Sequence, residues 1–180
     1  MDPDQTPAGA QEQMTDDQAG ALTGASLRGT VALQHSRTVF DAAVQTFASV
    51  CGVHLRAVDR SYGSFGAGVA SVTCMSGGVM WSAFVGLPDG TAREAAARVT
   101  GRHTGEDKST ADEAVARLGN IISTQVGALL ATIDVTADVM LPAMCHIDNF
   151  PGFVRRYDMG DFRCFSSEMG DVWVGVIAGL

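Results

Sequence analysis

A row of polar side chains at helical spacing is the part of this 180-residue sequence that could do chemistry. The row consists of residues that follow one another at intervals of four, three and four: Glu113, Arg117, Asn120 and Thr124. These intervals place all of them on one stripe of an α-helix. On periodicity alone the stripe is either a solvated face with a Glu113–Arg117 ion pair worth about 0.3–0.5 kcal/mol, or a row of hydrogen-bonding groups offered to a partner.

A long amphipathic helix must position this row. We expect the helix over about 110–131, opened by the capping box Thr110-x-x-Glu113. At about 100° per residue, the opposite stripe of the helix is apolar and consists of Val115, Leu118, Ile122, Val126 and Leu129. The two stripes predict that Asn120 is exposed to solvent while Leu118 and Ile122 are buried.

The other elements predict a layered α+β domain. The expected order is helix, strands, helix, long helix and further strands, which differs from the strict alternation of a parallel α/β fold. We expect an antiparallel-rich sheet of roughly six strands, packed against the long helix and two further helices. The expected elements are a helix over 28–50 ended by Gly52, strands over 53–62, 69–75 and 79–87, a helix opened by the capping box Thr91-x-x-Glu94 and ended by Gly101, and strands over 139–141 and within 143–180, of which 172–177 is central.

Composition and charge limit the classes of function. The chain has 12 Lys+Arg against 20 Asp+Glu, a formal net charge of -8, and no basic cluster larger than Arg155-Arg156. A protein that binds phosphate backbones needs a positive stripe, so nucleic acid and anionic membrane are poor partners. No apolar run approaches the roughly 20 residues that span a bilayer, and the N-terminus has no signal-peptide pattern. We therefore expect a cytoplasmic protein.

The first 27 residues differ in composition from the rest of the chain. They contain five acidic residues and no Lys or Arg, and they are rich in Gln, Gly, Ala, Thr and Pro. Such a segment cannot bury enough apolar surface to offset its ordering entropy. We predict a disordered acidic leader over 1–27 and a single folded domain over 28–180.

Two other sets of residues were candidates for chemistry. The cysteines lie far apart, with no C-x-x-C pair, which predicts buried thiols in place of disulfides or zinc ligands: Cys51, Cys74, Cys145 and Cys164. A different kind of enzyme could use one of two pairs, His146 with Asp148 or His103 with Glu106. Histidines at such positions are usually structural or solvated, and no nucleophile–base pair or metal-ligand spacing supports this third possibility.

The long helix and its surroundings resemble a known family. The helix carries the segment Val115-Ala-Arg117-Leu-Gly-Asn120-Ile-Ile-Ser-Thr124, and Pro142 follows Asn120 after 21 intervening residues. A glycine-led strand, Gly77-Gly78-Val79-Met80-Trp81, precedes it. In these motifs and in the order of elements over 31–180, the chain resembles the CheX/CheC/FliY chemotaxis phosphatases, and the CheX type most closely.

This resemblance implies an activity and a partner. Members of the family hydrolyse the phospho-aspartate of a response-regulator receiver such as CheY. They lay the motif helix across the receiver's active site, where the Asn orients a water for in-line attack while the receiver holds Mg²⁺ and the phosphoryl group. The resemblance therefore assigns the water-orienting role to Asn120 and structural roles to Pro142 and Gly78. It implies no metal or cofactor on this chain, and a homodimer joined through the sheet.

The sequence departs from the family motif at two positions. The acid that precedes the Asn by three residues is Arg117 here, and the glycine that follows it by four is Thr124. Glu113 stands where members often have an Asp. The family's acid pairs with the active-site lysine of the receiver, so Arg117 would face a like charge. Two functions stay open: a receiver phosphatase with Glu113, Arg117 and Thr124 as partner-binding residues, or a catalytically inactive CheX-like binding or dimerisation module.

Overall fold

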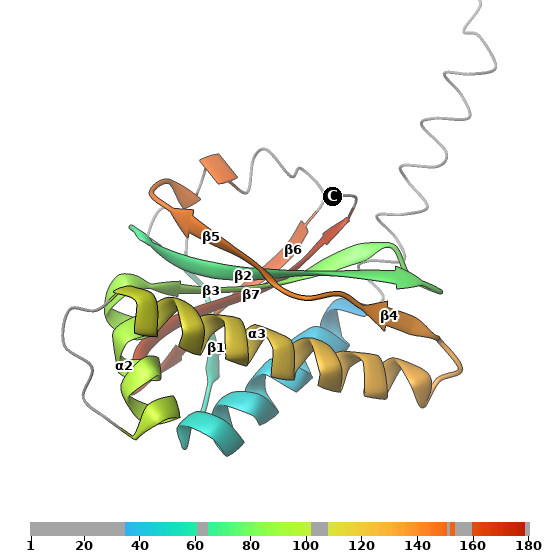
Figure 1. The fold of residues 1–180 in the computed structure, drawn as a ribbon, viewed down its shortest axis with the longest axis horizontal. Helices are drawn as coiled ribbons and strands as arrows, with labels where there is room; N and C mark the ends of the chain where they lie inside the picture. The colour runs from blue at the N-terminus through green and yellow to red at the C-terminus, as the bar shows by residue number, and fades with distance from the viewer. Residues whose placement is uncertain (1–34, 61–64, 102–107, 151, 154–159, 179–180) are drawn as a thin grey trace, which may run out of the picture.

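The structure is a computed structural model that describes residues 35–60, 65–101, 108–150, 152–153 and 160–178. The predicted acidic leader over 1–27 lies outside the described residues, as do 28–34 at the start of the first predicted helix. His103 and Glu106 also lie outside them. The described part confirms the α+β class, with helices gathered on one face of a single sheet (Figure 1).

The sheet is antiparallel throughout and has seven strands, one more than expected. Six strands follow the order β1-β6-β7-β3-β2-β4, and β5 pairs with β2 beside β4. The strands are β1 (Arg56–Val58), β2 (Gly68–Gly77), β3 (Trp81–Pro88), β4 (Ala137–Val139), β5 (Ala143–Ile147), β6 (Gly160–Ser167) and β7 (Gly170–Ala178). The expected central strand is confirmed, because β7 lies between β6 and β3. The strand expected over 53–62 is much shorter, since only Arg56–Val58 pairs with β6 at this edge.

Helices cover one face of the sheet (Figure 1). The first helix occupies 35–46 and continues into a π-helical turn, η1 (Phe47–Cys51), which ends at Gly52 in the left-handed conformation with φ of 68°. The other two helices are α2 (Asp89–Thr100) and α3 (Lys108–Ala131). Both predicted capping boxes are wrong, because α2 and α3 begin two residues before Thr91 and Thr110. Glu94 instead forms an ion pair with Arg98, one turn further along α2, at 3.0 Å.

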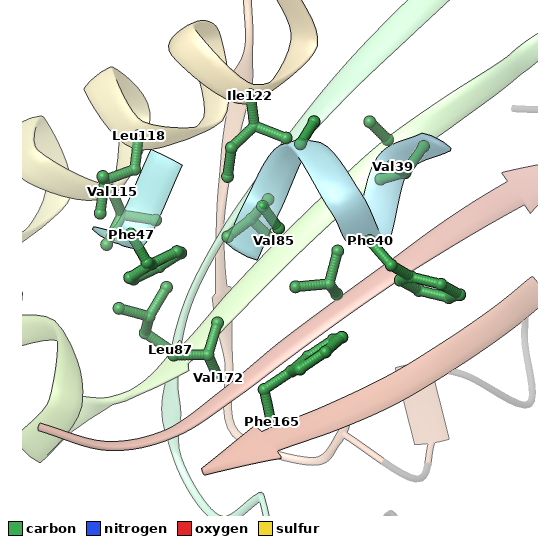
Figure 2. Close-up of a cluster of buried hydrophobic side chains, with 14 of the residues drawn as sticks. Val39, Phe40, Phe47, Val85, Leu87, Val115, Leu118, Ile122, Phe165 and Val172 are labelled. Carbon is green, nitrogen blue, oxygen red and sulfur yellow. The ribbon is translucent and has the colours of Figure 1, made fainter. Parts of the chain in front are cut away.

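The main core lies between the helices and the sheet. Apolar residues of α3 and of the first helix meet the odd-numbered positions of β3 and the even-numbered positions of β7 (Figure 2). Within α3, four of the five residues of the predicted apolar stripe are fully buried: Val115, Leu118, Ile122 and Val126. The fifth, Leu129, is half-buried, and its neighbour Leu130 fills the core instead.

A second core covers the opposite face of the sheet and is largely aromatic. Phe65 and Phe150 stack at 4.4 Å between ring centroids, and Phe84 meets Phe162 edge to face at 5.2 Å. Trp81 and Phe84, expected to pack in the sheet, do so on opposite faces, Trp81 in the main core and Phe84 in the second. Both faces of the central strands are therefore buried, which explains their nearly continuous apolar sequence.

A β-bulge interrupts the edge strand that follows α3. Val139 of β4 lies opposite Met75, and the Met140 N–H donates to the Cys74 carbonyl at 3.1 Å, whereas Ala143 of β5 lies opposite Val72. Two residues, Leu141 and Pro142, thus stand against one residue of β2, which is the definition of a bulge. Proline suits this place because it has no N–H to donate.

Of the described helices, α3 alone is long and apolar enough to cross a membrane, over Ser109–Ala131. Its apolar stripe is buried against the sheet and its outer stripe is polar. This is the pattern of a helix packed in the core of a folded domain.

Candidate functional site

The polar row of α3 lies on the outer surface of the domain. Glu113, Arg117, Asn120 and Thr124 are all exposed, while Leu118 and Ile122 on the other side of the helix are completely buried. The prediction that Asn120 faces solvent is therefore confirmed. The described structure brings a carboxylate, a guanidinium, an amide and a hydroxyl onto one accessible surface, which we call the α3 outer face.

The groups of the α3 outer face are free to meet a partner, with one exception. The expected Glu113–Arg117 ion pair is not among the ion pairs of the described residues. The Thr124 hydroxyl, in contrast, donates to the Asn120 carbonyl at 2.8 Å. Thr124 is thus held against its own helix, while the side chains of Arg117 and Asn120 project from it without a partner in the described part of the chain.

Close packing behind Asn120 brings α3 against β2. Gly119 is buried next to Ser71, and a β-carbon added at Gly119 would lie 2.6 Å from the Ser71 β-carbon. Glycine is therefore required at this position by space, since carbon atoms make their best contacts at about 3.5–4.0 Å. A second small residue, Ser123, is buried one turn later on the stripe that faces the sheet.

The first helix lies beside α3 and is joined to it (Figure 1). The buried Thr46 hydroxyl donates to the Gln125 side-chain oxygen at 2.9 Å. The π-helical turn η1 follows directly after Thr46, and such turns are common near functional sites. A hydrogen bond thus joins the first helix to α3 five residues after Asn120.

The two residues assigned structural roles lie at turns of the sheet. Pro142 forms part of the bulge between β4 and β5. The Gly78 N–H donates to the Thr136 carbonyl at 2.7 Å, and an added β-carbon at Gly78 would come within 2.7 Å of that same oxygen. Only glycine fits the approach of the β2–β3 turn to the segment that follows α3.

A charged pocket lies near the N-terminal ends of α2 and α3. It has a volume of about 210 Å³ and is lined by Val69, Asp89, Ala92, Arg93, Ala111, Asp112 and His146. His146 Nε2 lies 3.2 Å from the Asp112 carboxylate of α3, so the partner of His146 is Asp112 and not Asp148. His146 is 64% exposed, so this is a surface pair, and such pairs contribute little to stability.

The cysteines are all free, as expected. Cys51 and Cys164 are buried, and burial raises the pKa of each thiol to about 11. Cys74 and Cys145 are half-buried. Thiols with raised pKa are poor nucleophiles near neutral pH. Within the described residues, no group of three or more His, Cys, Asp and Glu side chains could hold a metal ion.

Sequence reasoning missed the residues that position the α3 outer face. Ser71, Thr46 and Asp112 contact partners that are distant in sequence, and no local pattern marks them. Gly119 did carry a signal, because a glycine inside a helix is about 1 kcal/mol less favourable than alanine and needs a reason to be there.

Comparisons with known proteins identify the fold. The sequence matches no protein-family model and no curated protein. Among solved structures, it is similar to the chemotaxis protein CheX from Desulfovibrio desulfuricans, with a TM-score of 0.64 at 16% identity, over 79% of this chain and 97% of that one. CheX from Vibrio vulnificus gives a TM-score of 0.65 at 13% identity, over 78% and 93% of the two chains. A chain of the CheX–CheY–BeF3–Mg²⁺ complex from Borrelia burgdorferi gives 0.62 at 21% identity, over 79% and 95%.

Proposed function

We propose that this domain, which has the fold of CheX-type chemotaxis proteins, is a phosphatase for the phospho-aspartate of a CheY-type receiver. The α3 outer face would dock on the receiver, and Asn120 would be the catalytic residue. The observation that carries the proposal is the exposure of Asn120, at the centre of a polar row on a CheX-like fold. A partner of this kind is supported by the neighbour that is a complex of CheX with CheY.

The proposed reaction needs little covalent chemistry from this chain. The Asn120 amide holds a water molecule in line with the acyl-phosphate bond of the receiver. The water oxygen attacks phosphorus, the bond from phosphorus to the aspartate oxygen breaks with its electron pair, and a carboxylate, inorganic phosphate and a proton result. Mg²⁺ belongs to the receiver and would neutralise the charge of the phosphoryl oxygens, so this chain contributes orientation and a water-excluding surface.

The alternative is that the same face binds a receiver, or another copy, without catalysis. Arg117 favours it, because its exposed guanidinium has no ion-pair partner among the described residues and would meet the receiver lysine as a like charge. Thr124 adds a side chain where the family has none. In either case we propose a cytoplasmic protein of a two-component or chemotaxis pathway.

We propose further that two copies associate through the β4–β5 edge of the sheet. This edge presents Leu141, 88% exposed, and Met140, 57% exposed, and Ile133 is also exposed in the turn before β4. Exposed apolar clusters of this kind mark protein–protein contacts. The opposite edge, β1, offers the exposed polar residues Arg56 and Asp59 instead, so it is the weaker candidate.

The experiment that tests the proposed function is phosphate release from a panel of phosphorylated receivers. The full chain should accelerate release from at least one receiver, and Asn120→Ala should abolish that acceleration. Glu168→Ala, which changes an exposed residue in the β6–β7 turn, is the matched control and should leave it unchanged. Binding without acceleration for every receiver would establish the alternative. Neither binding nor acceleration for any receiver would refute the phosphatase and the receiver-binding module, and would leave only association with another copy.

A further inference from the structure

We infer that Gly119 is a positioning residue, and that its contact with Ser71 sets how far Asn120 stands from the sheet. The inference rests on the proposed function for its kinetic consequences, but its structural part can be tested separately. Asn120 is exposed on the α3 outer face, and the residue immediately before it is buried against β2. The height of the amide above the sheet therefore depends directly on how closely α3 can approach at Gly119.

The contact leaves no room for a side chain. A β-carbon on Gly119 would lie 2.0 Å from the Ser71 hydroxyl oxygen and 2.6 Å from the Ser71 β-carbon. The hydroxyl can rotate away, but the β-carbon of Ser71 is fixed by the backbone of β2. Ser71 lies in the interior of the sheet, because it pairs with Val85 of β3 on one side and with Met144 of β5 on the other.

An alanine at position 119 must therefore push α3 outward. The carbon–carbon distance is about 1 Å shorter than the optimum of about 3.5–4.0 Å, so the helix must move by about that amount. A misplacement of about 1 Å can lower the rate of a positioned reaction about 100-fold. We expect Gly119→Ala to lower kcat for receiver dephosphorylation by about that factor.

The same helix offers a matched control. A β-carbon on Gly127 would lie 3.2 Å from one methyl carbon of Val139, and nothing else lies within 4 Å. A single methyl group at the end of a side chain can yield by a few tenths of an ångström. Gly127→Ala makes the same chemical change in the same helix, with the same gain in helix propensity. It should leave α3 in place and kcat within about two-fold of the unchanged chain.

A second substitution that restores kcat can identify the β-carbon of Ser71 as the atom that displaces α3 in Gly119→Ala. Ser71→Gly removes that atom, so Gly119→Ala combined with Ser71→Gly should restore kcat to within a few-fold of the unchanged chain. Ser71→Ala keeps the β-carbon and removes only the hydroxyl, which has no hydrogen-bond partner in the described structure. The combination of Gly119→Ala with Ser71→Ala should therefore stay impaired.

Crystal structures of the full chain and its variants complete the test. We expect α3 of Gly119→Ala to stand about 1 Å further from β2 than in the unchanged chain, and Ser71→Gly to bring it back. An unmoved α3, a displaced α3 with unchanged kcat, or equal rescue by Ser71→Ala and Ser71→Gly would overturn the inference. If the unchanged chain dephosphorylates no receiver, the proposed function fails, and the position of α3 in the two crystal structures decides whether the contact sets the height of Asn120.

Discussion

Replacing Arg117 by glutamate is the change that best separates a phosphatase from a binding module. Arg117→Glu recreates the acid that the CheX-type motif places three residues before the Asn. The side chain is exposed and forms no ion pair among the described residues, so the substitution breaks no ion pair in that part of the domain. Any large effect of the change must therefore come from the partner.

The expected size of the effect follows from the position of Arg117 on α3. The new carboxylate would stand four residues after Glu113, and a like-charge pair at this spacing costs about 0.2–0.5 kcal/mol of the free energy of unfolding. Toward the receiver, a repulsive contact with its lysine becomes a charge-assisted hydrogen bond, worth about 1.5–3 kcal/mol. If the contact persists in the transition state, kcat/KM should rise roughly ten- to a hundredfold.

The assay is single-turnover decay of a phosphorylated receiver that binds the unchanged chain. It compares the unchanged chain, Arg117→Glu, and Arg117→Glu combined with Asn120→Ala. We expect weak acceleration by the unchanged chain, a gain with Arg117→Glu, and loss of that gain in the double variant. Arg117→Gln is the matched control, because it removes the positive charge without supplying an acid and should give only part of the gain. Adding Thr124→Gly to Arg117→Glu tests whether the extra side chain also keeps the receiver away.

Two results would refute this reasoning. No acceleration by any of these variants, on any receiver that binds, would rule out a latent phosphatase and leave the binding module. Activity in the unchanged chain that Arg117→Glu destroys would mean that the guanidinium itself assists the reaction, for example by stabilising the charge of the phosphoryl group. The argument from like-charge repulsion would then be wrong.

Three further predictions concern packing, assembly and pH. Thr73→Val should raise the free energy of unfolding by about 1 kcal/mol in urea titrations, because the Thr73 hydroxyl is buried without a hydrogen-bond partner in the described structure; a loss of stability would contradict this. Leu141→Lys should convert a dimer to a monomer in light scattering, whereas Ala57→Lys on the opposite edge should not, and an unchanged dimer in both would exclude the proposed edge. Burial raises the pKa of Cys164 from 9.0 to about 11, so the unfolded chain loses this proton first and stability falls as the pH rises from about 9 to 11. The loss should be greater than in Cys164→Ala, and equal pH profiles of the two chains would count against it.

The helices and most strands could be predicted from the sequence because their signals are local. The two stripes of α3 follow from a period that every residue of the helix shares, and they placed Asn120 outside and Leu118 inside correctly. The capping boxes at Thr91 and Thr110 are equally local, yet both predictions are wrong. Each helix begins two residues before the proposed cap, and α2 follows directly from the last residue of β3.

Residue patterns therefore predicted the α+β class and the amphipathic α3, and the resemblance to CheX-type proteins suggested a role for Asn120. The contacts that hold Asn120 in place could not be predicted, because they join residues far apart in the sequence. Gly119 and Ser71 are 48 positions apart, and Thr46 and Gln125 are 79 positions apart. These contacts exist because α3 lies on β2 and beside the first helix, and that arrangement depends on the packing of the whole core. A pattern within one helix can show which side of that helix faces outward. The distance between the helix and the sheet depends on the residues of the strand against which it packs.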